Sequence, residues 1–268
     1  IEVSIEPVNK ESFVDVDQLA ALIRKETILV SVMAVNNEVG MIQPIQAISE
    51  LLKNYPKIHF HVDADQAIAK VPQELWLTER VDFATFSAHK FHGPRGVGFI
   101  YWREGRKLAP LMTGGGQEEN HRSGTENVAG IVAMAKALRL AVEKKAERPA
   151  HVAKLKEYLT EELQKFAKVT VFSGAENFAP HILCFALQGI RGEVMVHALE
   201  EKQIYISTTS ACSSRSKTES STLHAMNVAG NLATSAVRVS LDESNTMAEV
   251  EQFLIIFNQL YRKFSKVN

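Results

Sequence analysis

The sequence predicts an α/β fold in which a mostly parallel sheet is followed by a smaller α/β domain. Short apolar runs alternate with segments of helical periodicity in the first half, which is the order that builds parallel sheets. Polar residues of chemical interest fall where these runs end, and such sheets bind ligands at the carboxyl ends of their strands. We expect a large domain at residues 1–145 and a small domain at residues 146–268.

The first half contains four strand candidates and one early helix. Residues 28–35 are nearly continuous in apolar side chains, so we expect a strand buried on both faces. Pro44 suits the first turn of a helix with one apolar face. Further strands are expected at 58–64, 81–87 and 97–102.

The second half pairs long helices with short strands. A helical pattern starts at Thr125 and ends at a charged break over residues 143–149, and a second helix follows with leucines in register. The last helix carries an apolar stripe from Val250 to Phe264. Strands are expected at 169–172, 181–187, 204–207 and 236–241.

Composition excludes several functional classes. The 268 residues are 46% hydrophobic and 23% charged, with a formal net charge of -1. This balance gives no electrostatic case for nucleic acid or a membrane as the main partner, and no run approaches the roughly 20 apolar residues of a membrane span. Residues 1–5 alternate like the interior of a strand, so we expect this chain to be a piece of a longer protein.

The two cysteines stand in contrasting surroundings. Cys212 lies in a small, polar, loop-like stretch with Arg215 and Lys217 close by, which favours an exposed thiolate. Cys184 lies in an apolar run, where a buried and unreactive thiol is expected. Two cysteines cannot form a disulfide framework, so we expect a reducing, cytoplasmic environment.

Lys90 follows an apolar run in Ser87-Ala88-His89-Lys90, before a glycine-rich stretch. A lysine held at a strand end is suited to forming a Schiff base. The Ser87 hydroxyl and the His89 imidazole could bind a phosphate beside it. Together with an upstream aspartate, this pattern indicates a pyridoxal phosphate (PLP) site. The alternative is a surface lysine next to a turn.

Period-two spacing places His59, His61 and Asp63 on one strand face. Three interpretations stay open: a metal site, polar residues satisfied near the sheet end, or a carboxylate at Asp63 that keeps a PLP ring nitrogen protonated. In the third case Gln66 would lie close to the phenolic oxygen of the cofactor.

Several strings of this chain resemble those of the NifS/IscS-type cysteine desulfurases, which belong to the class V aminotransferase family. These enzymes have PLP fold type I (aspartate aminotransferase-like). The strings occur in order from one end of the chain to the other. They are Asn36-Asn37-Glu38-Val39-Gly40, His61-Val62-Asp63-Ala64-Asp65-Gln66, Ser87-Ala88-His89-Lys90, Gly114-Gly115-Gly116-Gln117-Glu118, Arg122-Ser123-Gly124-Thr125 and Ser210-Ala211-Cys212.

The resemblance implies roles for the first group of residues. Lys90 matches the Schiff-base lysine and Asp63 the partner of the pyridine nitrogen. Gln66 matches the ligand of the ring hydroxyl. Ser87 and His89 match the phosphate binders.

Four further roles come from the same resemblance. Asn37 matches the residue near the ring oxygen and the substrate carboxylate, and Arg238 matches the arginine that pairs with that carboxylate. Thr125 matches the threonine that reaches the phosphate of a neighbouring subunit, which implies a homodimer with shared sites. Cys212 matches the cysteine that carries the persulfide. For Arg238 a surface salt bridge remains the alternative.

The implied activity is the conversion of L-cysteine to L-alanine, with the sulfur passed on from Cys212. Acceptor proteins could serve iron–sulfur cluster assembly, tRNA thiolation or thiamine synthesis. The family's N-terminal segment, with a phosphate-binding loop and a histidine that stacks on the cofactor, has no counterpart before Ile1.

Other functions also stay open. The chain could be another fold-type-I enzyme, such as a selenocysteine lyase or an aminotransferase, and an aminotransferase has no need of Cys212. It could be an inactive fragment that acts only as an interaction module. Nucleotide binding at Gly114-Gly115-Gly116 is disfavoured, because no Gly-Lys-Ser/Thr ending follows.

Overall fold

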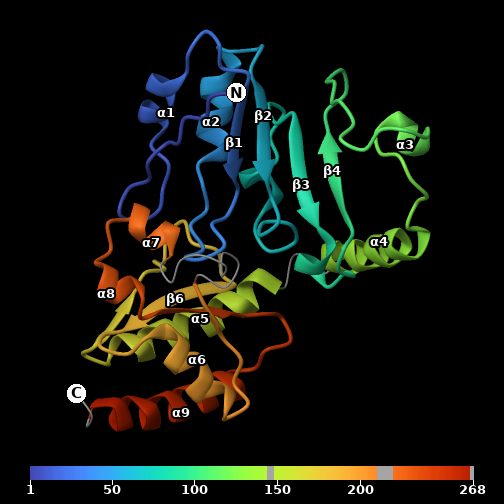
Figure 1. Cartoon of the computed structure of the whole chain (residues 1–268). Helices are drawn as coiled ribbons and strands as arrows, with labels where there is room; N and C mark the ends of the chain where they lie inside the picture. Colours follow the sequence, from blue (N-terminus) through green and yellow to red (C-terminus); the bar gives the residue numbers. More distant parts are fainter. Residues whose placement is uncertain (144–147, 210–219, 266–268) are drawn as a thin grey trace. The chain divides into compact units, whose positions relative to one another are not determined.

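The computed structural model describes residues 1–143, 148–209 and 220–265 of the chain (Figure 1). The chain forms two compact units. Unit 1 comprises Ile1–Ile23, Val35–Pro44 and Ala146–Asn268, and unit 2 comprises Arg24–Ala34 and Ile45–Lys145. Both units combine a sheet with helices, which confirms the predicted α/β class. The expected division into residues 1–145 and 146–268 stays a prediction.

Unit 2 is built on a four-stranded sheet in the order β1-β2-β3-β4. The strands β1, β2 and β3 are parallel, and β4 is antiparallel to β3. A mostly parallel sheet was predicted and is confirmed. The bounds are β1 Leu29–Met33, β2 His59–Asp63, β3 Phe83–Ser87 and β4 Gly98–Trp102.

The helix that follows Pro44 buries the apolar face predicted for it. In α2 the side chains of Ile45, Ile48 and Leu52 are fully buried, and Figure 1 shows this helix against the sheet of unit 2. The Arg80 side chain links its end to the strands, since Nε donates to the Leu52 carbonyl at 3.1 Å. The helical segments of unit 2 are α2 Ile45–Lys53, η1 Gln73–Leu75, η2 Ala88–Phe91, α3 Gln117–Asn120 and α4 Val128–Glu143.

Two expectations for the apolar N-terminal stretches were wrong. Residues 28–35 were expected to form a strand buried on both faces, but in β1 only Val30 is buried and Leu29 is 51% exposed. The exposed residues Leu29, Ser31 and Met33 alternate along β1 and so share one strand face, which the described residues leave uncovered. Residues 1–5 alternate like a strand yet form none, because no described strand pairs with them.

Unit 1 is built on an antiparallel sheet in the order β5-β6-β8-β7. Its strands are β5 Val169–Val171, β6 Ile182–Leu187, β7 Ser207–Thr208 and β8 Ala236–Ser240. Its helices are α1 Val16–Leu22, α5 Arg148–Gln164, α6 Gly192–Glu200, α7 Ser221–Ala225, α8 Gly230–Ala233 and α9 Met247–Ser265.

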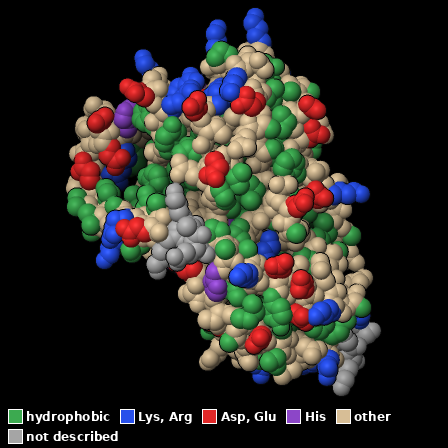
Figure 2. Space-filling view, turned by 180° about the vertical axis from the view of Figure 1, so that it is seen from behind, with side chains coloured by type: hydrophobic (Ala, Val, Ile, Leu, Met, Phe, Trp, Pro, Cys, Tyr) green, Lys and Arg blue, Asp and Glu red, His purple; other side chains and the backbone are tan. Residues whose placement is uncertain are grey.

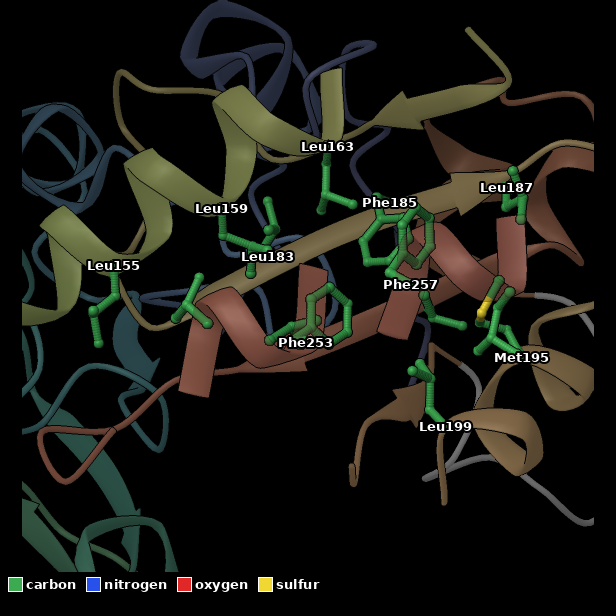
Figure 3. Packing of buried hydrophobic residues seen from close by; sticks show 14 residues of the cluster. Leu155, Leu159, Leu163, Leu183, Phe185, Leu187, Met195, Leu199, Phe253 and Phe257 are labelled. Atoms are coloured by element: carbon green, nitrogen blue, oxygen red, sulfur yellow. The ribbon is translucent and has the colours of Figure 1, made fainter. Parts of the chain in front are cut away.

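The core of unit 1 lies between its sheet and three helices. Figure 3 shows leucines of α5 and phenylalanines of α9 around the central strand β6, with Met195 and Leu199 of α6 completing the cluster. All six residues of β6 are buried, as the continuous apolar run at 181–187 predicted. The Phe257 ring meets Phe185 and Phe166 in edge-to-face contacts, with centroids 5.6 and 5.1 Å apart.

The surface matches the neutral composition. On the face shown in Figure 2, acidic and basic side chains are interspersed among apolar and polar ones. No helix among the described residues combines the length and the apolar character that a membrane crossing requires.

Candidate active site

Asp63 and Ser87 lie at the carboxyl ends of neighbouring parallel strands in unit 2. Asp63 is the last residue of β2 and Ser87 the last residue of β3. Asp63 is in register with Thr85, and Ser87 is two residues further along the same strand. Period-two alternation therefore places Thr85 and Ser87 on one face of β3. The structure brings these two predicted residues to the same sheet edge.

Lys90 lies in the short helix η2, which starts directly after Ser87. Its side chain is half-buried and that of His89 is exposed. The turn is tight because the Gly93 N–H donates to the Ala88 carbonyl at 2.8 Å. A Cβ at Gly93 would lie 2.8 Å from the Ala88 Cβ, so only glycine fits there. Gly93 thus allows the backbone to turn tightly against Ala88, next to Lys90.

Asp65 connects these two strand ends, and sequence reasoning missed it. Its N–H donates to Asp63 Oδ1 at 3.1 Å. Its carboxylate accepts from the Ser87 N–H and, at 2.9 Å, from Ser87 Oγ. The Asp-Ala-Asp spacing was the available signal, because it puts a second carboxylate at the same strand end.

His61 forms a hydrogen-bonded chain across three strands. Its Nδ1 lies 2.8 Å from Ser31 Oγ on β1, and its Nε2 lies 3.1 Å from Thr85 Oγ1 on β3. Both ring nitrogens are therefore engaged, which disfavours the metal interpretation of His59, His61 and Asp63. Burial lowers the pKa of His61, and the charge of Asp63 opposes that shift. A neutral imidazole is the form that such a chain stabilises.

Two other predicted residues belong to unit 2. Gln66 is half-buried in the turn after β2. Thr125 is exposed in the segment before α4, where its carbonyl accepts from Arg122 Nη1 at 3.1 Å. Their assigned roles stay predictions.

In unit 1 the structure brings Asn37 and Arg238 together. Arg238 lies on β8, and its Nη1 donates to the Asn37 carbonyl at 2.8 Å. Asn37 belongs to a turn in which the Asn36 side chain accepts from the N–H groups of Glu38 and Val39, each at 2.9 Å. The Nε of Arg238 is buried and has no hydrogen-bond partner among the described residues. A buried guanidinium donor without a partner suits an anionic ligand.

Glu38 is a buried carboxyl that sequence reasoning also left without a role. Ser220 Oγ donates to it in a short hydrogen bond, and Ser220 is the N-cap residue of α7. Burial raises the pKa of Glu38, while hydrogen bonds from Ser220 and Thr222 and the charge of Arg238 oppose that shift. Glu38 and Ser220 are 182 residues apart in sequence, so no local sequence pattern could predict their contact.

Of the two cysteines, only Cys184 lies among the described residues. Cys212 lies outside the described residues, so its role stays a prediction. Cys184 lies on β6 and is fully buried, as expected. Burial raises the pKa of its thiol, and the charge of Glu38 adds to the shift. A thiolate does not form readily at this position, which confirms the expectation of a buried, unreactive thiol at Cys184.

The residues of unit 2 fit PLP by the chemistry of their side chains. An amine, a carboxylate, a hydroxyl and an imidazole follow one another at the ends of β2 and β3. These are the groups that a carbonyl, a pyridine nitrogen and a phosphate require. The fit is incomplete at Ser87, because its hydroxyl proton is directed to Asp65.

Comparison with known proteins identifies the family. The family model described as aminotransferase class-V matches residues 1–253. A NifS/IcsS protein homolog from Lactobacillus delbrueckii subsp. bulgaricus is 53% identical over 263 residues, covering 98% of this chain and 68% of the relative. The cysteine desulfurase IscS of Dictyoglomus turgidum is 38% identical over 271 residues, covering 100% of this chain and 68% of the relative.

A solved structure has the same fold. A NifS-like protein superimposes with a TM-score of 0.88 at 38% identity, covering 99% of this chain and 68% of that protein. This agreement confirms the predicted fold type. Each of these comparisons spans about two thirds of the relative's own length.

Proposed function

Because this chain belongs to the class-V aminotransferase family, we propose that it is a PLP-dependent cysteine desulfurase. The proposed reaction converts L-cysteine into L-alanine and leaves the sulfur as a persulfide on Cys212. The observation that carries this proposal is the identity of 53% and 38% to a NifS/IcsS homolog and to a cysteine desulfurase over nearly the whole chain. The motifs that occur in order along the sequence agree with it.

The residues of unit 2 would hold the cofactor. Lys90 would supply the amine, and Asp63 would keep the ring nitrogen protonated. Ser87 and His89 would bind the phosphate, and Gln66 the ring hydroxyl. When bound, PLP withdraws electrons from the substrate Cα and so weakens the bond between Cβ and Sγ.

Arg238 and Asn37 would orient the substrate. The buried Nε of Arg238 has no described partner, while Nη1 is already fixed on the Asn37 carbonyl. That bond holds the guanidinium plane in place before a ligand arrives. A carboxylate can then accept from Nε and a terminal nitrogen in a bidentate pair.

Protons and sulfur would then be moved by two side chains. The Nζ of Lys90 takes the proton from the substrate Cα. The Cys212 thiolate attacks the substrate Sγ, so that a sulfur–sulfur bond forms as the bond from Sγ to Cβ breaks. Protonation of Cβ and return of a proton to Cα, which Lys90 would deliver, would complete L-alanine, and the persulfide would remain on the protein.

We also propose a homodimer. At the start of α4, directly after Thr125, Val128 is 66% exposed, Ile131 38% and Val132 63%. These positions share one helix face. An exposed apolar face of this kind is typical of an interface. Sedimentation of the full chain should show a dimer that Val128→Glu weakens.

The sulfur acceptors would be proteins of iron–sulfur cluster assembly or of tRNA or thiamine thiolation. Persulfide chemistry and an unpaired Cys184 fit a reducing compartment, and we place the protein in the cytoplasm.

Sulfur transfer to Cys212 is tested by incubating the full chain and PLP with ³⁵S-labelled L-cysteine. We expect label on the wild type and on Cys184→Ala, released by a thiol reductant. Cys212→Ala should stay unlabelled while it keeps bound PLP. Equal labelling of Cys212→Ala and the wild type would contradict the proposal.

A further inference from the structure

Asp65 ties together the two strand ends that carry the predicted cofactor ligands. It contacts Asp63 through its backbone N–H and Ser87 through both carboxylate oxygens. Asp65 and Ser87 are both half-buried. The 22 residues that separate Asp65 from Ser87 in sequence make this a link between β2 and β3 and not a local turn.

The link occupies the groups that a phosphate would use. A serine hydroxyl has one proton, and in this structure Ser87 Oγ gives it to Asp65 Oδ2 at 2.9 Å. The Ser87 N–H is likewise directed to Asp65 Oδ1. An ionised carboxylate and a phosphate dianion both only accept hydrogen bonds. They therefore compete for the same two donors of Ser87.

The negative charge of Asp65 also opposes phosphate binding at Ser87. A phosphate bound at Ser87 would lie next to the Asp65 carboxylate, and two anions at that separation repel each other. His89, the other predicted phosphate ligand beside Ser87, is exposed. A neutral side chain of the same shape at position 65 would keep the link and remove the repulsion.

We propose that Asp65 is a positioning residue that braces Ser87 against β2 and, by competing for the Ser87 donors, weakens the binding of the cofactor phosphate. This inference rests on the proposed function, because it takes Ser87 as a phosphate ligand. Asp65→Asn separates the two effects. Its amide oxygen can still accept from the Ser87 N–H, and its NH₂ group can donate to Ser87 Oγ, which frees the hydroxyl proton for the phosphate.

The test is the dissociation constant of PLP, measured by equilibrium dialysis with the full chain. We expect Asp65→Asn to bind PLP about tenfold more tightly than the wild type, the size of effect that removing one nearby unit charge produces. Asp65→Ala lacks both charge and brace and should bind PLP more weakly than Asp65→Asn. Pyridoxal, which has no phosphate, should bind the wild type and Asp65→Asn equally.

Two controls keep the outcomes distinct. In a Ser87→Ala background the gain from Asp65→Asn should shrink at least threefold, since no hydroxyl remains to be freed. Asp65→Ser serves as a second neutral variant, with far-UV circular dichroism confirming that each variant is folded. Unchanged or weaker PLP binding by both folded neutral variants would overturn this inference alone. Absence of PLP binding by the wild type and all variants would overturn the proposed function as well.

Discussion

Asp82 is a fully buried carboxylate shared by three arginines in unit 2. Arg80 Nη1 lies 2.9 Å from Oδ2, Arg106 Nε lies 2.8 Å from Oδ1, and Arg103 also pairs with Oδ1. The Phe60 N–H donates to Oδ2 at 2.9 Å. Burial would raise the pKa of Asp82, but these hydrogen bonds and charges outweigh it, so the pKa lies below its ordinary value. The stabilisation is present above that ordinary value of 3.8 and is lost as the pH falls further.

Asp82→Asn should destabilise the protein by about 3–5 kcal/mol, because the buried guanidinium of Arg80 and the half-buried ones of Arg103 and Arg106 lose the carboxylate that they share. Urea unfolding followed by circular dichroism measures this. Asp17→Asn, on the exposed surface of α1, should change stability by no more than about 0.5 kcal/mol. Similar unfolding midpoints for both variants would contradict the claim that the ion pairs of Asp82 stabilise the fold.

Lys156 is a buried lysine on α5. Its Nζ donates to the Ala179 carbonyl at 2.9 Å and lies 5.6 Å from the centroid of the Phe178 ring. Burial lowers the pKa of Lys156 from 10.5 to about 8. Below pH 8 the folded state therefore carries the unfavourable burial of an ammonium group. This destabilisation is lost as the pH rises from about 8 towards 10.5, because Lys156 is then deprotonated in the folded state.

Replacing Lys156 with methionine should remove this pH dependence. The stability of the wild type, measured relative to Lys156→Met, should rise by about 2 kcal/mol between pH 7.5 and pH 10. Urea unfolding at the two pH values gives the comparison, and other titrating groups cancel in the difference. Parallel pH profiles for the two proteins would show that Lys156 is not desolvated.

At the scale of elements, the segments at 181–187 and 58–64 predicted the positions of two strands well. The expected strand at 181–187 is β6, Ile182–Leu187, and the expected strand at 58–64 is β2, His59–Asp63. Burial itself was less predictable, since β1 is also rich in apolar residues but exposes Leu29 and Met33 on one face. The strand expected at 204–207 is instead the two-residue strand Ser207–Thr208, which overlaps the expected range only at Ser207. The short helices α7 and α8 were missed, because five and four residues hold too few turns for helical periodicity to show. The nine-residue helix α6 was missed as well.

The candidate site was predictable where a motif is local and not where strands must pair. The turn from Ser87 to Lys90 follows a strand end and precedes several glycines, so the local sequence was enough to predict it. The contact of Arg238 with Asn37 spans 201 residues and depends on the position of β8. The link from Asp65 to Ser87 likewise depends on the parallel register of β2 and β3. Side-chain contacts of this range require the fold.

Ser220 stabilises the start of α7 in two ways. Its Oγ accepts from the Leu223 N–H at 3.0 Å as an N-cap and donates to the buried carboxyl of Glu38. Loss of the cap exposes a helix donor, and loss of the donation leaves Glu38 with one partner fewer.

Ser220→Ala should therefore lower the free energy of unfolding by about 2–3 kcal/mol, the sum of a lost cap and a weakened buried carboxyl. The neighbouring Ser221→Ala is the matched control, because Ser221 is exposed and should change stability by less than about 0.5 kcal/mol. Thermal unfolding of the two variants measures this difference in stability. Equal melting temperatures would mean that the hydrogen bonds of Ser220 contribute nothing.

At the scale of the whole molecule, the family and the fold agree with the function that the motifs predict. The class-V aminotransferase match extends over residues 1–253, and the fold agrees with a NifS-like structure at a TM-score of 0.88. All the proposed chemistry depends on one covalent attachment. The central claim is therefore that this chain binds PLP through Lys90.

The most direct test is to add PLP to the full chain, reduce it with borohydride and locate the pyridoxyl group by tandem mass spectrometry. We predict one major modified residue, Lys90, and loss of the visible absorption band in Lys90→Ala. The exposed Lys107 is the matched control, and Lys107→Ala should keep both the band and the label. Label spread evenly over surface lysines, or an unchanged band in Lys90→Ala, would contradict the account.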